Sequence, residues 1–380
     1  MLKGCIIGLG RMGITHFSIL NSHPKVKVVA VCDPSRFILR SAAKYLGVET
    51  FENPTKMIEN RDLDFVIVAT PTAHHADMVR LSIEHNLHVF VEKPFVLNVQ
   101  QGQDLLCLLQ GKTLVHQVGY VLRFAPVFRQ VKALLDCHTL GELLTFRMEM
   151  NSPTLLRDAK HSWRSKKTEG GGCLYDFASH GIDMINYLIG VPDEVVGTVF
   201  QSIYSIDVED AISSTLLYNS GVRGNFLVNW SDPSYRKPAY HFEVLGRKGK
   251  LIADLHSYRI FFREAPSLDG FTEGWNQRYI TDMLEPVRFY LRGFEFTSQL
   301  DHFVDCILEG TPNGVCSFEQ GHAANIVIER LQNDAGKRRS EYGYDHFRGQ
   351  SILRDQSHVG TESPGSSREI QRYERDTSSD

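Results

Sequence analysis

Three glycines near the N-terminus constrain the fold of this chain more than any other feature. They form the pattern Gly8-x-Gly10-x-x-Gly13, which follows a short apolar run and precedes a helical pattern. In a strand–turn–helix unit, Gly8 permits the turn, Gly10 lets the backbone approach a pyrophosphate, and Gly13 lets helix and strand pack closely. The helix N-terminus then faces the phosphates. The pattern therefore predicts a dinucleotide site, formed by Gly8, Leu9, Gly10, Arg11, Met12 and Gly13.

An acidic residue at the end of the next apolar segment supports this interpretation. Asp33 lies 20 residues after Gly13, where a carboxylate accepts hydrogen bonds from the adenosine ribose. A carboxylate at this place disfavours a 2′-phosphate, so we expect NAD rather than NADP, although the nearby Arg36 keeps NADP open. The alternative is a plain strand–helix turn with Asp33 in a solvated loop.

The first third of the chain alternates apolar strands with helical patterns. Nearly continuous apolar strands separated by helices are typical of a parallel sheet covered on both faces. Ligands bind beyond the carboxyl ends of such strands, so Gly8, Asp33, Thr70 and Lys93 are expected to meet in one crevice. The expected elements after the second strand are strands at 65–69, 87–91 and 113–119 and helices at 76–85 and 100–109.

The pattern changes after Arg123, where several strands follow one another with short turns. Consecutive strands of this kind indicate an antiparallel sheet. The expected elements are helices at 128–135, 174–189, 296–308 and 321–331 and strands at 143–150, 195–202, 211–218, 224–230, 241–245 and 250–254. The fold class is therefore α/β, with a Rossmann domain at 1–122, an α/β domain with a large, open, mainly antiparallel sheet at 123–335, and a flexible tail at 336–380.

Composition excludes several classes of protein. The chain has 380 residues, of which 42% are apolar and 23% charged, which fits a soluble globular protein of about two domains. Its net charge of −4 gives no basic excess for nucleic acid, and no apolar stretch reaches the roughly 18 residues of a membrane span. Seven scattered cysteines show no zinc spacing, and nothing resembles a targeting signal. We expect a cytoplasmic protein without a bound metal.

Two distant segments carry the residue types that alcohol–carbonyl redox chemistry requires. Lys93 comes directly after an expected strand, and Asp176 and His180 are one helical turn apart behind Gly170-Gly171-Gly172. Histidine titrates near neutral pH and can take the hydroxyl proton, and a lysine can stabilise negative charge that develops on the reacting oxygen. The alternative interpretation is structural, with His180 as a buried core histidine and Lys93 as a surface charge at the end of a strand. Taken together with the glycine pattern, Lys93, Asp176 and His180 are the predicted catalytic and substrate-binding residues.

The chain resembles the glucose–fructose oxidoreductase / inositol dehydrogenase (Gfo/Idh/MocA) family. The resemblance runs from Lys3 to about Asn333 and includes two mild departures, Thr72 after Thr-Pro and Ala178 between the Asp and the His. It implies a Rossmann domain followed by a domain with an open antiparallel sheet. It also implies NAD(P)-dependent redox chemistry on sugars, cyclitols or sugar nucleotides. The segments that carry it are 8–13, Ala69-Thr70-Pro71 with His75, Glu92-Lys93-Pro94, 119–123, Trp163-Arg164, 170–172 with Asp176, His180 and Asp183, and Val208-Glu209-Asp210.

Further residues are expected to support the site. Arg123 is either a substrate ligand or part of an ion pair between the domains, and Asp183 is expected to support His180 from behind. A basic loop with Arg157, Lys160, Lys166 and Lys167 either clamps a nucleotide-sugar pyrophosphate or is simply solvated. The residues expected around the cofactor, besides the glycine turn, Asp33 and Arg36, are Thr70, Pro71, His75, Glu92, Lys93, Pro94, Trp163 and Arg164.

The predicted function is hydride transfer between NAD(P) and a secondary hydroxyl or ketone of a sugar, cyclitol or nucleotide sugar. Two alternatives stay open: glycoside hydrolysis through transient oxidation with NAD kept bound, and a regulator that binds NAD(P) without catalysis. A small-molecule partner is expected, with no nucleic acid or membrane. A homodimer or homotetramer is expected to form through the second sheet, with Phe226, Val228 and Trp230 as its apolar surface.

Overall fold

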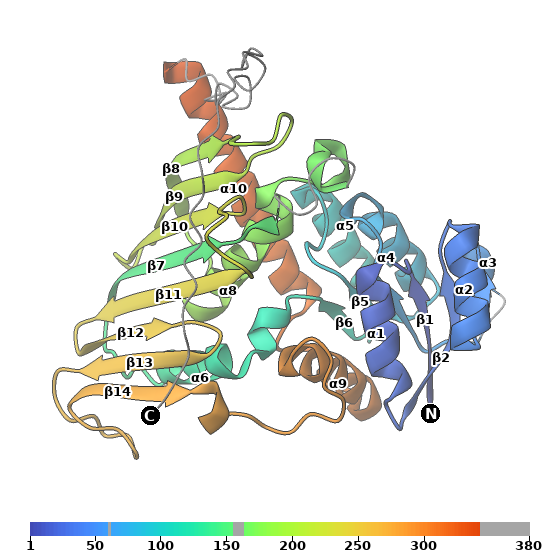
Figure 1. The fold of residues 1–380 in the computed structure, drawn as a ribbon, viewed down its shortest axis with the longest axis horizontal. Coiled ribbons are helices and arrows are strands. Elements are labelled where there is room, and N and C mark those ends of the chain that lie inside the picture. Colours follow the sequence, from blue (N-terminus) through green and yellow to red (C-terminus); the bar gives the residue numbers. More distant parts are fainter. Residues whose placement is uncertain (60–61, 155–162, 343–380) are drawn as a thin grey trace, which may run out of the picture.

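The computed structural model describes residues 1–59, 62–154 and 163–342. A six-stranded sheet and an eight-stranded sheet lie on opposite sides of the molecule (Figure 1). Helices α8 (Ser179–Leu188) and α10 (Phe318–Tyr342) lie between them, because α10 contacts strands of both sheets and also packs on α8. The mixed α/β class predicted from the sequence is confirmed.

The six-stranded sheet is parallel throughout and has the order β3-β2-β1-β4-β5-β6. Its strands are β1 (Leu2–Ile7), β2 (Val26–Cys32), β3 (Glu49–Phe51), β4 (Phe65–Val68), β5 (His88–Val91) and β6 (His116–Val118). The helices that connect them are α1 (Arg11–Asn21), α2 (Arg36–Leu46), α3 (Pro54–Glu59), α4 (His75–Glu84) and α5 (Val99–Leu109). All four side chains of β4 are fully buried, as expected for a central strand with helices on both faces.

One face of this sheet is covered by a helix from the far end of the chain. Ile6, Phe65 and Phe90 pack in one cluster with residues of α1, and α9 (Phe294–Glu309) contributes Leu300 and Phe303 to that cluster. The edge-to-face contacts of Phe303 with Phe65 and Phe90 fix α9 on the sheet. Helix α9 therefore completes the N-terminal domain, although it follows the second sheet in the sequence.

The eight-stranded sheet has the order β14-β13-β12-β11-β7-β10-β9-β8. The neighbouring strands β7 and β10 are parallel, and every other pair is antiparallel. The strands are β7 (Leu143–Asn151), β8 (Glu194–Gln201), β9 (Ala211–Leu217), β10 (Arg223–Asn229), β11 (Ala239–Gly246), β12 (Gly249–Ala253), β13 (Ser257–Phe262) and β14 (Gly274–Tyr279). Strand β14 was not predicted, because it is an edge strand whose side chains are mostly exposed or partly exposed.

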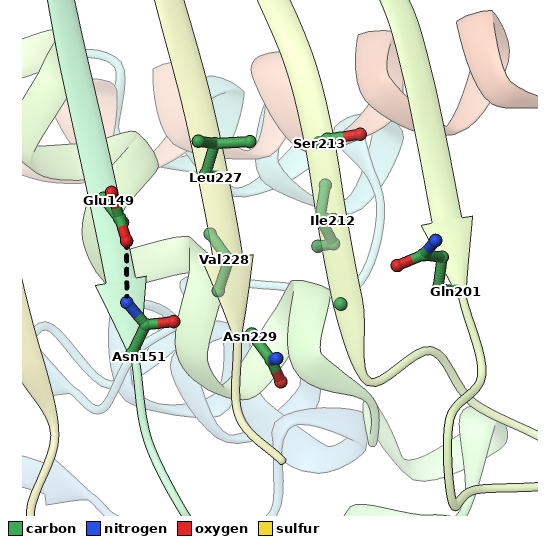
Figure 2. Close-up of a pocket in the computed structure, with 9 residues that line it drawn as sticks. Glu149, Asn151, Gln201, Ile212, Ser213, Leu227, Val228 and Asn229 are labelled. Carbon is green, nitrogen blue, oxygen red and sulfur yellow. Dashed lines mark hydrogen bonds between the residues drawn. The ribbon is translucent and has the colours of Figure 1, made fainter. Parts of the chain in front are cut away.

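The three residues expected to form an oligomer surface lie on the covered face of the eight-stranded sheet and not on its exposed face. Phe226, Val228 and Trp230 are buried, and a Cβ added to Gly181 of α8 would lie 2.8 Å from the Phe226 ring. This side of the sheet packs on α8, so the prediction for these three residues is wrong. The opposite face carries mixed side chains around a shallow pocket of about 210 Å³ (Figure 2). Glu149, Asn151, Gln201, Ser213, Leu227 and Asn229 line it.

The remaining helices complete the second domain. Helix α10 continues to Tyr342, beyond position 336 where the tail was expected to begin, and residues 343–380 lie outside the described residues. No helix in the described ranges has the length and apolar character needed to cross a membrane. The short helical segments are α6 (Pro126–Asp136), the 3₁₀ turns Thr72–His74, Val121–Phe124, Trp163–Ser165, Lys167–Glu169 and Ile280–Asp282, and a π-helical turn at Leu174–Ala178.

Candidate active site

The glycine turn between β1 and α1 leaves room for a ligand. Gly8 has φ of +94°, and a Cβ on Gly13 would lie 1.9 Å from the Gly8 carbonyl oxygen. Among the described residues, no atom lies within 4 Å of the Cβ position of Gly10, and no side chain caps α1. An uncapped helix N-terminus with an open approach offers its N–H groups to a pyrophosphate. The turn therefore fits a dinucleotide.

Asp33 and Arg36 answer the question of cofactor type. The Asp33 carboxylate is buried and accepts hydrogen bonds from the N–H groups of Leu9 and Ser35, at 2.9 Å each. Each oxygen keeps a lone pair for a ribose hydroxyl, because an ionised carboxylate accepts about four hydrogen bonds. Arg36 Nε donates to Glu52 at 2.8 Å, so its charge is already paired. The site thus presents a carboxylate at the ribose, which favours NAD.

A buried histidine joins the two loops that follow β4 and β5. The His75 ring lies between the Thr70 carbonyl oxygen, 3.0 Å from Nε2, and the Pro94 carbonyl oxygen, 2.9 Å from Nδ1. Thr70-Pro71 and Lys93-Pro94 are therefore tied together, and the Lys93–Pro94 bond is cis. His75 is fully buried, so its geometry supports a role in ordering these two loops.

A second buried histidine, His16 on α1, supports the same edge of the sheet. Its Nε2 lies 2.6 Å from Glu92 Oε1, and the other Glu92 oxygen accepts a long hydrogen bond from the Lys93 N–H at 3.3 Å. Burial opposes ionisation of Glu92, but the hydrogen bond with His16 and its charge outweigh burial and lower the pKa of Glu92. Glu92 is thus an ionised anchor beneath Lys93. Sequence reasoning missed His16, which faces the sheet from the first two turns of α1.

Lys93 and Asp176 meet in a nearly buried ion pair. The Lys93 ammonium donates to Asp176 Oδ1 at 2.9 Å and to the Asp176 carbonyl oxygen at 2.5 Å. Arg164 Nε donates to Asp176 Oδ2 at 2.7 Å. Burial raises the pKa of Asp176, but the charges of Lys93 and Arg164 prevail and hold it well below its usual value. Asp176 is therefore ionised and orients two cations.

The segment that carries Asp176 is a π-helical turn rather than the regular α-helix predicted over 174–189. The turn Leu174–Ala178 precedes α8 without a break in the chain's helical path. Wide turns of this kind occur often at functional sites, because they shift a side chain out of the regular helical register. Here the turn directs the carbonyl and the carboxylate of Asp176 to the same ammonium.

His180, in the first turn of α8, has a partly exposed ring close to this ion pair. Its Nδ1 atom is buried and has no hydrogen-bond partner among the described residues. The Tyr120 ring stands edge-on to it with centroids 6.3 Å apart, and the Tyr120 hydroxyl is equally unpartnered within the described chain. Burial, and after it the charge of Lys93, lowers the pKa of His180, and Asp176 partly offsets both, so that the pKa is about 3. His180 is thus neutral at physiological pH.

This depressed pKa predicts how the reaction rate depends on pH. A neutral imidazole can accept a proton, and His180 keeps that form from pH 8 down to about pH 5 because its pKa lies below the ordinary value of 6.5. The acid limb of kcat/KM for oxidation should therefore lie below about pH 5. A profile measured between pH 4 and 9 checks this. An acid limb of the wild type centred near 6.5 would contradict it.

Arg123 and Asp183 correct two predictions. The Arg123 guanidinium donates to both Asp183 oxygens at 2.7 to 3.1 Å, and Nη1 donates to the Val315 carbonyl oxygen and to Gln320. The exposed fractions of the two side chains are 3% and 1%. Arg123 is therefore a buried structural cation and not a substrate ligand, and its ion pair lies within 123–335 and not between the two predicted domains. Asp183 pairs with Arg123 instead of supporting His180.

Part of the predicted site lies outside the described residues. Arg157, Lys160 and the side chain of Trp163 belong to this part. Lys166 is exposed and pairs with Glu169 at 2.9 Å, as expected for a solvated loop. No group of three or more potential metal ligands occurs in the ranges that the structure describes.

Fold and site together define an oxidoreductase that binds NAD through its N-terminal domain. Residues 2–120 match the family model of the oxidoreductase family with an NAD-binding Rossmann fold, and residues 128–252 match the model of the GFO/IDH/MocA C-terminal domain. The chain belongs to the Gfo/Idh/MocA family.

Named relatives extend this assignment. The scyllo-inositol 2-dehydrogenase (NAD(+)) of Bacillus subtilis is 26% identical over 81% of this chain and 87% of its own length. The myo-inositol 2-dehydrogenase of Thermotoga maritima is 27% identical over 88% of this chain and 96% of its own length. Among solved structures, a levoglucosan dehydrogenase in complex with NADH and levoglucosan shares the fold, with a TM-score of 0.78, 21% identity, and coverage of 88% and 97% of the two chains.

Proposed function

We propose that this enzyme transfers hydride between NAD and a secondary hydroxyl, or the corresponding ketone, of a polyhydroxylated ring. The observation that carries the proposal is the convergence of Lys93, Asp176 and His180, from two domains, beside the edge of the sheet that holds the glycine turn. An ionised carboxylate, a fixed ammonium and a neutral imidazole are the groups that oxidation of an alcohol requires.

Each of the three side chains has a distinct part in this reaction. Lys93 uses two of its three N–H donors on Asp176, so one remains for the reacting oxygen of the substrate. His180 accepts the hydroxyl proton during oxidation and returns it during reduction. Asp176 fixes the ammonium and can accept a hydrogen bond from a neighbouring substrate hydroxyl. Bound NAD supplies the hydride acceptor.

The relatives support a ring polyol as the substrate class. Two of them are named for the oxidation of inositols and one solved neighbour for levoglucosan, an anhydro-sugar. Free sugars, cyclitols and nucleotide sugars all present the vicinal hydroxyls that Lys93, Asp176 and His180 would contact. A non-catalytic regulator has no need for this ion pair at the end of the cofactor crevice, which weighs against that alternative. Glycoside hydrolysis through transient oxidation would use the same residues.

A substrate panel tests the proposal. NADH absorbance at 340 nm is followed when the protein and NAD meet inositols, aldoses, levoglucosan and UDP- or dTDP-sugars, with Lys93→Met and His180→Asn as matched variants. Net NADH formation on one member, lost in both variants, is the expected result. Consumption of a glycoside without net NADH would favour the hydrolytic alternative. Turnover that survives both substitutions would overturn the assignment of the three residues.

The assembly of the chain is part of the same proposal: a homodimer or homotetramer that buries the exposed face of the eight-stranded sheet. At one end of this face, Phe261 and Trp275 stack edge-to-face with ring centroids 5.5 Å apart, and the Arg259 guanidinium lies 5.5 Å from the Trp275 ring. An exposed sheet face with aromatic side chains favours pairing with a partner.

Light scattering during gel filtration at micromolar concentration measures this assembly. A mass of two or four chains is expected for the wild type, and Trp275→Lys is expected to shift the equilibrium toward single chains, because it places a charge in the buried face. Phe37→Lys, at an exposed site on α2, serves as the control and should leave the mass unchanged. A wild type with the mass of a single chain would contradict the proposed homodimer or homotetramer.

A further inference from the structure

The segment between β14 and α9 contacts α1 near both ends of that helix. Near the C-terminal end of α1, Arg288 donates to the Ile19 carbonyl oxygen at 3.2 Å and to Asp301 of α9 at 2.5 Å. Near the N-terminal end, Arg292 Nη1 lies 3.1 Å from Met12 Sδ and 3.5 Å from Thr15 Oγ1. The second domain therefore places an arginine at the glycine turn.

The partners of Arg292 leave its hydrogen-bonding capacity largely unused. A guanidinium carries five N–H donors, and a thioether sulfur is a weak acceptor. The Phe296 ring, 4.9 Å from the guanidinium carbon, supports it from one side. Within the described ranges, no carboxylate forms an ion pair with Arg292, although Glu92 and Glu295 lie near enough to influence it. This contrasts with Arg288, which is paired with Asp301.

Positive charge accumulates around this guanidinium. The charges of Glu92 and Glu295 only partly offset the effects of partial burial and of the neighbouring Arg11, which lower the pKa of Arg292, so two cations lie close together. The positive end of the α1 dipole adds to them. Such an arrangement is unfavourable unless an anion binds between the cations, and arginine is suited to phosphates because its planar fork can donate twice to one group.

We propose that Arg292, which follows the last strand of the second domain, is a ligand of the cofactor pyrophosphate. The inference rests on the binding of NAD by this chain and is independent of the sugar substrate. Gly10 and the first N–H groups of α1 hold the diphosphate from one side, and Arg292 neutralises it from the other. The cofactor is then bound by both domains.

Binding measurements on the full chain test this assignment. The fluorescence of NADH gives its Kd, and competition against NADH gives the affinities of ADP-ribose, which keeps the diphosphate, and of adenosine, which lacks it. Arg292→Gln should weaken NADH and ADP-ribose by roughly 10- to 100-fold, the value of a charged hydrogen bond, and leave adenosine unchanged. Arg292→Lys should restore part of the loss, since it keeps the charge.

Arg288→Gln is the matched control, because it alters the same segment at the other end of α1. It should leave all three affinities unchanged. The proposal is overturned if Arg292→Gln binds NADH as the wild type does, if it loses adenosine along with NADH, or if Arg288→Gln loses as much. If the wild type binds NADH and Arg292→Gln binds it with the same Kd, only this inference is overturned and the proposed function stands. A wild type that does not bind NADH overturns both.

Discussion

Replacement of Lys93 by methionine is expected to lower kcat by about 10²–10³-fold, the typical effect of removing one group that stabilises charge at a reacting oxygen. Methionine preserves most of the length and the apolar stem, so packing in the crevice changes little. The variant loses the ammonium, and with it the N–H donor that Lys93 offers to the substrate. Asp176 keeps Arg164 as its cation. Steady-state kinetics with the substrate found in the panel, together with the Kd of NADH, measures the effect.

The affinity for NADH should change far less than kcat, because Lys93 is directed at Asp176 and not at the glycine turn. Lys166→Met is the matched control, since Lys166 is an exposed lysine of the same region whose partner is Glu169. It should retain the activity of the wild type. A Lys93→Met enzyme within tenfold of the wild-type kcat would refute the role of Lys93 in the reaction.

Arg123→Met is expected to destabilise the fold by about 3–5 kcal/mol, because it leaves the Asp183 carboxylate buried without its counter-charge. Burial already raises the pKa of Asp183 in the wild type, and Arg123 opposes this rise. The variant also frees the Val315 carbonyl oxygen and Gln320 at the start of α10. Denaturant unfolding, followed by far-UV circular dichroism, gives the change in the free energy of unfolding.

An exposed ion pair provides the comparison. Arg247 pairs with Glu142, and both side chains are more than half exposed, so Arg247→Met should lower the free energy of unfolding far less than Arg123→Met does. The double variant Arg123→Met with Asp183→Leu should recover most of the stability, because it removes both buried charges together. A cost below about 1 kcal/mol for Arg123→Met alone would show that the buried pair contributes little.

The sequence was sufficient to predict the position of a residue wherever that position depends only on the residue's own strand or helix. The glycine turn, Asp33 and Lys93 each follow a short apolar strand, and parallel strands bring their carboxyl ends to one edge, so the crevice could be predicted without a structure. The spacing of Asp176 and His180 likewise placed them near each other. In these cases the position of a residue along its own element fixes where it lies.

Contacts between distant segments could not be predicted in this way. Arg123 had two expected roles because nothing in its vicinity in the sequence reveals Asp183, which lies on another helix. The prediction that Phe226 and Trp230 face outward was wrong. Alternation with a period of two shows that a strand has an apolar face, but it does not show which face of the sheet a helix covers. The position of α9 on the first sheet, and of Arg292 on α1, depends on the return of the chain between domains.

Helix α10 has a mechanical consequence. Its N-terminal half is held by the first domain, where Asn325 donates to the Val96 carbonyl oxygen at 2.6 Å and Gly321 packs against Val118. Its later turns are held by the second, where Asp334 accepts the Thr198 N–H at 2.6 Å. One rigid rod is thus clamped at both ends. Hinge bending between the two domains would strain one of these attachments, so we expect the domains to move little relative to each other when the cofactor binds.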